Sequence, residues 1–187
     1  AYHLVTNITP RMTDVKNKPL VRELLSTLME LVGVKFIMKH CVGVVVAAKT
    51  PKLTQDVLEY FARVLVEFPD TAVDAKALVD VVKVTAFEQA VPAVKQVGML
   101  LVAALRHRVG PKIDNLLQEI NPHIKASLEG EFERFTPMPD VQPREIRQQQ
   151  AGPGANGGDA APAAGSRGVT SSSSAAAAAA LPQRDED

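Results

Sequence analysis

The chain has 187 residues, of which 21 are Lys or Arg and 21 are Asp or Glu, so its formal net charge is zero. This length allows one ordinary domain and a tail. The balanced charge argues against a whole-chain electrostatic attraction to nucleic acid or to an anionic membrane. The charge is uneven along the chain, however. Residues 1–50 hold seven basic and three acidic residues, whereas residues 51–136 hold ten and twelve, so a basic patch near the start is a candidate feature.

The only cysteine, Cys41, stands in an apolar run. One cysteine cannot form an internal disulfide, and a zinc site would need several more ligands, so the sequence indicates a reduced, intracellular protein. The longest apolar stretch, residues 42–48, is far shorter than the roughly 20 residues that a membrane span needs. A helical pattern is already under way at Ala1, which is neither an initiator methionine nor part of a signal peptide. We therefore interpret the chain as a piece of a longer protein.

Apolar residues recur at helical spacing through residues 1–136, and short breaks with Pro or Gly separate the segments. In chain order, the pattern predicts helices over residues 1–13, 19–32, 34–48, 51–68, 73–87, 92–109, 111–120 and 122–135. The helices that begin at a proline include those at Pro19, Pro51 and Pro92. Proline suits the first helical turn because its fixed φ matches the helix and its missing N–H has no partner there.

The helices form pairs, and each of the three prolines begins the second helix of a pair. The prolines are 32 and 41 residues apart, a spacing typical of stacked helix hairpins of the HEAT or armadillo kind. Each hairpin must stack on its neighbours to bury its apolar faces. The sequence therefore predicts an all-α solenoid over residues 1–136. A compact helical bundle fits the same periodicity and is the alternative.

The composition changes after residue 136. Prolines at 137, 139 and 143 lead into three glutamines, a Gly/Ala/Pro stretch, four serines, six alanines and an acidic end. Such a segment has too little apolar surface to offset the entropy lost on ordering. Residues 137–187 are therefore predicted to be a disordered, low-complexity linker or tail.

Residues suited to catalysis or metal binding are few and scattered. The four histidines, His3, His40, His107 and His123, fall on different predicted helices, and Cys41 among valines is typical of a structural thiol. The clustered glycines lie in the predicted tail, where they cannot form a phosphate-binding loop. We expect no enzymatic activity, no cofactor and no metal.

Lysines recur in the predicted turns within the helix pairs: Lys16 and Lys18, then Lys49 and Lys52, then Lys95. Solenoids carry function on loops that line up along one edge. A lysine at a helix start opposes the macrodipole, so local helix stability does not explain these residues. Solubility alone explains any single exposed lysine. The same charge at successive equivalent turns favours a shared acidic partner.

Several segments occur in the order seen in one family of helical repeats. They are Thr-Asp-Val-Lys at 13–16, Lys-Thr-Pro-Lys at 49–52, Val-Leu-Glu-Tyr-Phe at 57–61, Val-Pro-Ala-Val-Lys at 91–95, Val-Gly-Pro at 109–111 and Leu-Glu-Gly-Glu-Phe-Glu at 128–133. Together they resemble the C-terminal two-thirds of a middle, third-like TOG domain of the ch-TOG/Minispindles-type microtubule polymerases. The chain departs from that pattern at Val91 and Lys95, where the family has asparagine and arginine, and it contains no tryptophan.

The resemblance implies a tubulin-binding segment of a microtubule-associated protein that promotes plus-end growth and spindle organisation. It implies αβ-tubulin or the microtubule plus end as the partner, and centrosome or kinetochore proteins as partners of the parent protein. The implied location is the cytoplasm and cytoskeleton, including microtubules, spindle poles, the centrosome and the kinetochore. The residues expected to face tubulin are Lys16, Lys18, Lys49, Lys52, Val94 and Lys95. Two alternatives are a generic HEAT scaffold in transport or coat assembly and a helical regulatory subunit of an enzyme.

Overall fold

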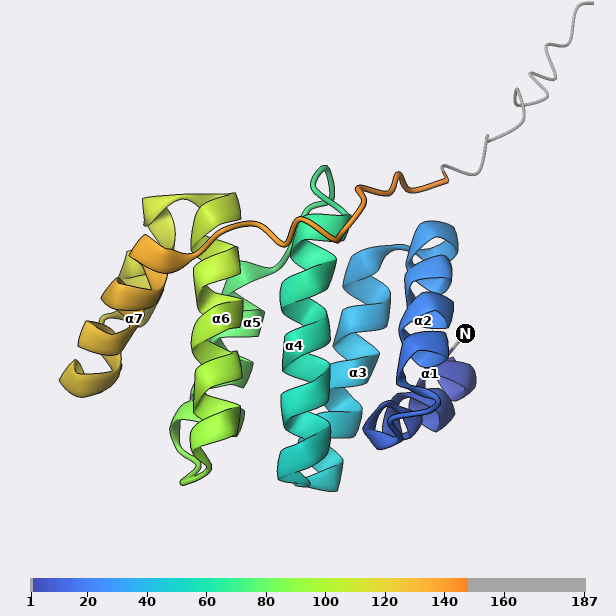
Figure 1. Cartoon of the computed structure of the whole chain (residues 1–187), viewed down its shortest axis with the longest axis horizontal. Helices are drawn as coiled ribbons and strands as arrows, with labels where there is room; N and C mark the ends of the chain where they lie inside the picture. The colour runs from blue at the N-terminus through green and yellow to red at the C-terminus, as the bar shows by residue number, and fades with distance from the viewer. Residues whose placement is uncertain (1, 148–187) are drawn as a thin grey trace, which may run out of the picture. The chain divides into compact units, whose positions relative to one another are not determined.

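The computed structural model describes residues 2–147, in which all regular structure is helical (Figure 1). The elements are α1 (Tyr2–Ile8), the 3-10 segment η1 (Thr9–Thr13), α2 (Lys18–Val32), α3 (Val34–Ala48), α4 (Pro51–Glu67), α5 (Ala75–Val82), the π-helical segment η2 (Lys83–Phe87), α6 (Pro92–Val109), the 3-10 segment η3 (Pro111–Leu117) and α7 (Pro122–Arg134). The prediction of an all-α fold is confirmed. None of the helices in residues 2–147 combines the length and the apolarity that crossing a bilayer requires.

The helices form two layers of a repeat array. Helices α2, α4 and α6 lie side by side in one layer, and α3 and α5 lie behind them (Figure 1). Helix α4 packs closely along α6, and α3 contacts both α2 and α4. This arrangement is the predicted solenoid rather than a compact bundle.

Prolines and glycines set the helix boundaries as the sequence predicts. Pro51 and Pro92 are the first residues of α4 and α6, and Pro19 is the second residue of α2. Gly33 and Gly110 have φ values of 94° and 80°, which favour glycine, and each ends the helix before it. Two predicted helices differ in detail, since residues 83–87 are π-helical and residues 111–117 form a 3-10 helix.

A continuous apolar core runs through both layers. Its largest fully buried side chains come from η1, α2, α3, α4, α6, η3 and α7 and include Met12, Leu25, Met29, Ile37, Leu58, Phe61, Leu101, Leu105, Ile113 and Leu128. Because these residues belong to successive helix pairs, each pair buries its inner face only against its neighbours.

Within the third pair, α6 approaches the end of α5 and η2 closely at Gly98. A Cβ atom at this position would lie 2.7 Å from the Cβ of Ala86 and 3.2 Å from Cγ1 of Val82. Glycine therefore allows α6 to contact the end of α5 and η2 directly.

Residues 137–147, which we call the strap, differ from the expectation of a linker that begins at 137. The strap is not helical, but it runs from the end of α7 back past α6 and α4 toward α2 (Figure 1). Its Val141 is buried, and backbone N–H groups of Arg144 and Arg147 donate to the carbonyl oxygens of Glu67 and Glu30. Specific ion pairs hold this stretch, which composition alone does not reveal. Residues 148–187 of the predicted tail lie outside the described residues.

Candidate functional site

The turns within the helix pairs lie along one edge of the array. Residues 14–17 before α2, residues 49–50 before α4 and residues 88–91 before α6 are all at the same end of the stack (Figure 1). The turns between pairs, at Gly33, residues 68–74 and Gly110, are at the opposite end. The fold thus brings the predicted lysines to one edge, since Lys16 and Lys49 lie in these turns and Lys18, Lys52 and Lys95 lie in the first turns of the helices that follow. We call this side of the molecule the turn edge.

Lys49 occupies the tip of the middle turn. Its backbone is in the left-handed region, with φ 50° and ψ 26°, and its N–H donates to the carbonyl of Val45 at 3.1 Å. It is the only non-glycine residue with positive φ in residues 2–147. This conformation ends α3 and exposes the Lys49 side chain to solvent.

Lys18 and Lys52, by contrast, converge on a buried carboxylate. Oδ1 of Asp56 accepts hydrogen bonds from Nζ of Lys18 at 2.8 Å and from Nζ of Lys52 at 3.1 Å. The Asp56 side chain is only 1% exposed. Its other oxygen, Oδ2, has no hydrogen-bond partner among the described residues. A buried carboxylate is costly unless it is paired, so these two lysines serve the fold of the turn edge as well as its charge.

Glu59 extends this network along α4. Its Oε2 accepts a hydrogen bond from Nζ of Lys18 at 2.9 Å and lies 2.8 Å from Nη2 of Arg22. Partial burial acts to raise the pKa of Glu59, but Lys18 and Arg22 outweigh it and hold the pKa below its usual value. Burial likewise acts to lower the pKa of Lys18, but its hydrogen bonds to Asp56 and Glu59 outweigh burial and raise it. Both groups are therefore charged at neutral pH.

The remaining predicted residues divide into exposed and buried ones. Lys16 is exposed, in a turn where its backbone N–H donates to Oδ1 of Asp14 at 3.0 Å. Lys95 is half-buried in the first turn of α6. Val94 is 0% exposed and packs in the core, so the expectation that it faces a partner is corrected. Helical periodicity turns Val94 inward while Lys95 points outward.

Three residues that the sequence reasoning missed also shape the turn edge. Asp56 and Glu59 pair with the lysines, and Val15 is an apolar side chain that is 82% exposed beside Lys16. The i,i+4 spacing of Lys52 and Asp56 was available as a signal for an ion pair. No local pattern indicates that Lys18 joins the same carboxylate from another helix.

Cys41 behaves as the structural thiol that its sequence context indicates. It is 0% exposed and lies 3.5 Å from Oγ1 of Thr9. Burial raises its pKa to about 11, so little thiolate exists at neutral pH. In the part of the chain that the structure describes, no group of three His, Cys, Asp or Glu side chains is placed to hold a metal ion.

The sequence has significant similarity to two plant proteins, although no family model matches it. The chain is 24% identical over 130 residues to Protein MOR1 of Arabidopsis thaliana, which covers 70% of this chain and 7% of that protein. It is 22% identical over 153 residues to Protein MOR1 of Oryza sativa subsp. japonica, which covers 81% of this chain and 8% of that protein. The chain thus spans less than a tenth of the length of these relatives.

Among solved structures, the chain matches Drosophila melanogaster Mini spindles TOG3. The TM-score is 0.66 at 18% sequence identity, and the match covers 77% of this chain and 62% of that one. The array of helix pairs is therefore a HEAT-like helical domain with the TOG fold. Together, this fold and the MOR1 similarity support a TOG domain of the ch-TOG family, which the order of the sequence motifs resembles.

Proposed function

We propose that this TOG segment binds αβ-tubulin through its turn edge, as part of a microtubule-associated protein that promotes plus-end growth and spindle organisation. The observation that carries the proposal is the alignment of the three turns on one edge of a TOG fold, with Lys16 and Lys49 in the first two turns and Lys95 in the first helical turn of α6 after the third (Figure 1). Tubulin is strongly acidic, and a cationic edge both steers such a partner and fixes its orientation.

The turn-edge residues have different roles in this proposal. Lys16 and Lys49 stand at the tips of the first two turns, and Lys95 lies in the first helical turn of α6, directly after the third turn. We infer that these three lysines contact the acidic partner directly. Lys52 contributes charge while it also pairs with Asp56, and Lys18 positions the first turn through Asp56 and Glu59. Val15 adds an apolar contact beside Lys16.

Each lysine at such a rim contributes a modest amount, roughly 0.2–1 kcal/mol, and the contribution falls with added salt. Lysine in place of the family's arginine at position 95 acts as a point charge rather than a bidentate fork. The third turn therefore adds positive charge to the binding edge but does little to fix the orientation of the partner.

The parent protein's other properties follow as part of the same proposal. We place it in the cytoplasm on microtubules, spindle poles, the centrosome and the kinetochore, with centrosome or kinetochore proteins as further partners. The segment itself acts by binding rather than by catalysis. Its partner is a protein, and neither nucleic acid nor a membrane is required.

A binding measurement with purified αβ-tubulin tests the proposal. The full chain is titrated with tubulin at about 50 mM and about 200 mM salt, and the Lys16→Glu/Lys49→Glu variant is compared with wild type. We expect a complex at low salt, weaker binding at the higher salt, and roughly a ten-fold higher Kd for the variant.

The matched control is Lys112→Glu/Lys125→Glu, which reverses the same number of charges on η3 and α7, away from the turn edge. The control should bind much like wild type. An equal loss in both double variants would mean that net charge rather than the turn edge drives binding. The lack of any complex at low salt would rule the proposal out for this segment.

A further inference from the structure

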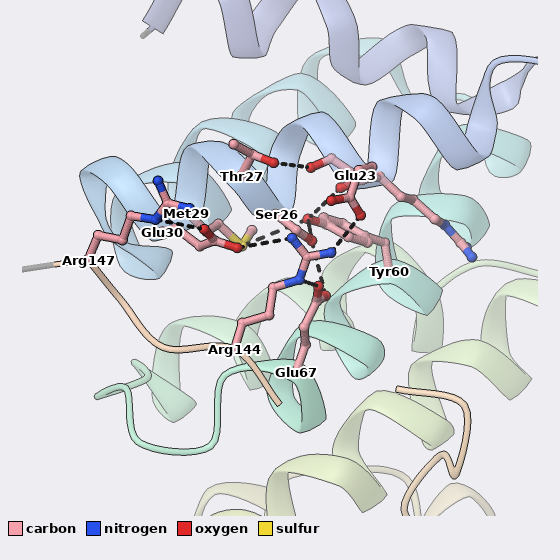
Figure 2. Close-up of polar contacts among 10 residues, drawn as sticks. Glu23, Ser26, Thr27, Met29, Glu30, Tyr60, Glu67, Arg144 and Arg147 are labelled. Atoms are coloured by element: carbon pink, nitrogen blue, oxygen red, sulfur yellow. Dashed lines mark hydrogen bonds and ion pairs between the residues drawn. The ribbon is translucent and has the colours of Figure 1, made fainter. Parts of the chain in front are cut away.

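The seam between α2 and α4 contains three carboxylates that form no ion pair with any lysine or arginine of these two helices. Glu23 and Glu30 come from α2, and Glu67 comes from the last residue of α4 (Figure 2). Glu67 is only 6% exposed, and its Oε2 accepts a hydrogen bond from Oγ of Ser26 at 3.0 Å. Ser26 also lies 3.0 Å from the hydroxyl oxygen of Tyr60. The seam is therefore an organised polar site rather than a loose group of surface acids.

The guanidinium of Arg144 enters this site from the strap (Figure 2). Nε lies 2.6 Å from Oε1 of Glu67, Nη1 donates to Oε1 of Glu30 at 3.0 Å, and Nη2 donates to Oε2 of Glu23 at 2.6 Å. The backbone N–H of Arg144 also donates to the carbonyl of Glu67 at 2.6 Å. Three donor groups of one planar fork thus meet three separate carboxylates, a geometry that the point charge of lysine cannot reproduce.

Other charged residues of the strap also pair with side chains of opposite charge on α2 and α4. Oδ2 of Asp140 accepts a hydrogen bond from Nη1 of Arg63 at 2.8 Å. At the other end, the backbone N–H of Arg147 donates to the carbonyl of Glu30 at 3.1 Å, and Nε of Arg147 lies 3.6 Å from Oε2 of Glu30. Asp140, Arg144 and Arg147 of the strap therefore each have a partner of opposite charge on α2 or α4.

The site needs an arginine for its own stability. Burial raises the pKa of Glu67, although Ser26, Arg144 and Arg63 act in the opposite direction. The hydrogen bond from Arg144 lowers the pKa of Glu23. Without Arg144, the three carboxylates would repel one another in a partly buried site, which would destabilise the seam.

The strap does not fill the seam. A groove of about 390 Å³ remains beside Arg144, and its lining runs from Val15 and Lys18 at the turn edge to Glu67. The strap is bound at one side of this groove by side-chain ion pairs, two backbone hydrogen bonds and the buried Val141. An extended segment held in this way can leave without unfolding the helices.

We propose that the α2–α4 seam is a docking site for an extended peptide anchored by arginine, and that residues 140–147 are its resident, exchangeable ligand. The segment undocks and redocks as a unit, and the same segment supplied by a second copy of this chain can take its place. When docked, it ties α2 to α4 and so restrains the first helix pair against the second.

A peptide-exchange experiment tests this proposal on the full chain. The probe is a fluorescent peptide with the sequence of residues 138–147. The receptors are the wild-type chain and the Arg144→Ala/Arg147→Ala variant, in which the resident segment lacks its anchors. The peptide should bind the variant at least about ten-fold more tightly than wild type, because the resident segment no longer competes.

Two peptide variants and one receptor variant test the specificity. An Arg144→Ala peptide should not bind measurably, and an Arg144→Lys peptide should bind roughly ten-fold more weakly than the parent peptide. Adding Glu23→Gln to the receptor variant should weaken binding, whereas adding Glu88→Gln, which lies near the turn edge, should not. Equal binding to wild type and variant, or binding that does not depend on Arg144, would overturn the proposal.

Hydrogen exchange measured on the receptor distinguishes undocking of the strap from unfolding of the helices. In wild type, the amides of Arg144 and Arg147 should be protected because both donate to helix carbonyls. In the Arg144→Ala/Arg147→Ala variant, protection should be lost at these amides and kept in α4 and α6. Loss of protection throughout α4 and α6 would make the strap a fixed part of the fold and refute an exchangeable ligand.

Discussion

Nζ of Lys18 lies 2.8 Å from Oδ1 of Asp56, an ion pair that joins the start of α2 to the buried side of α4. Lys52 approaches the same oxygen at 3.1 Å from within α4. Some lysines of the turn edge therefore stabilise the fold through a buried ion pair, while others are exposed to solvent. The consequence for mutagenesis is that its lysines are not equivalent.

Asp56→Asn should destabilise the fold. The substitution removes the negative charge that pairs with Lys18 and Lys52 and leaves both ammonium groups without their buried partner. We expect a loss of about 2 kcal/mol in the free energy of unfolding, measured by urea denaturation, because the pair is buried on one side only. Asp114→Asn, which breaks the more exposed pair with Arg106, is the control and should cost at most about 0.5 kcal/mol. Similar losses in both variants would mean that burial gives Asp56 no special role.

Gly98→Ala should also destabilise the fold, although alanine is the better helix former. The added Cβ would lie 2.7 Å from the Cβ of Ala86, so α6 must move away from η2. We expect a cost of about 1–3 kcal/mol from overpacking, seen as a lower Tm. Gly43→Ala on α3 is the matched control, since a Cβ there meets nothing within 4 Å among the described residues. The control should gain about 0.5–1 kcal/mol, and equal effects of the two substitutions would contradict the close approach at Gly98.

Lys49→Gly should separate charge from stability at the turn edge. Lys49 has φ 50°, a conformation that costs a residue with a side chain about 1 kcal/mol and that glycine adopts readily. The variant should therefore be as stable as wild type or up to about 1 kcal/mol more stable by urea denaturation. Lys49→Ala keeps the strain and should show no gain. If Lys49→Gly binds tubulin less tightly while its stability is unchanged or increased, the lost charge is responsible for the weaker binding.

The acid stability of the domain should depend on Glu59. Lys18 and Arg22 hold the pKa of Glu59 below its usual 4.5 in the folded state. The carboxylate therefore contributes stability that is fully present above its unfolded-state pKa and is lost as the pH falls through the lower folded-state pKa. Glu59→Gln should be less stable than wild type at pH 6, and the difference should narrow by pH 3 in urea unfolding. If the difference in the free energy of unfolding between wild type and Glu59→Gln stayed constant with pH, it would not originate in the ion pairs of Glu59.

Local sequence signals predicted most of the fold. The prolines that begin α4 and α6, the glycines that end α2 and α6, and the apolar spacing between them placed each helix to within a few residues. These signals succeed because they act through φ preferences and side-chain periodicity, which depend on near neighbours in the chain. The same signals identified the turns, so the positions of Lys16, Lys49 and Lys95 on the turn edge followed from the repeat.

The tertiary structure alone decided which side chains of the site meet. It buried Val94, joined Lys18 to Asp56 across 38 residues, and brought Arg144 to Glu30 and Glu23 across 114 and 121 residues. Composition placed residues 137–147 in a linker because a short polar segment has little apolar surface to bury. An ion-pair site assembled from two helices far away in the chain holds that segment in place. No local pattern can encode this partner, because it exists only where the fold places α2 beside α4.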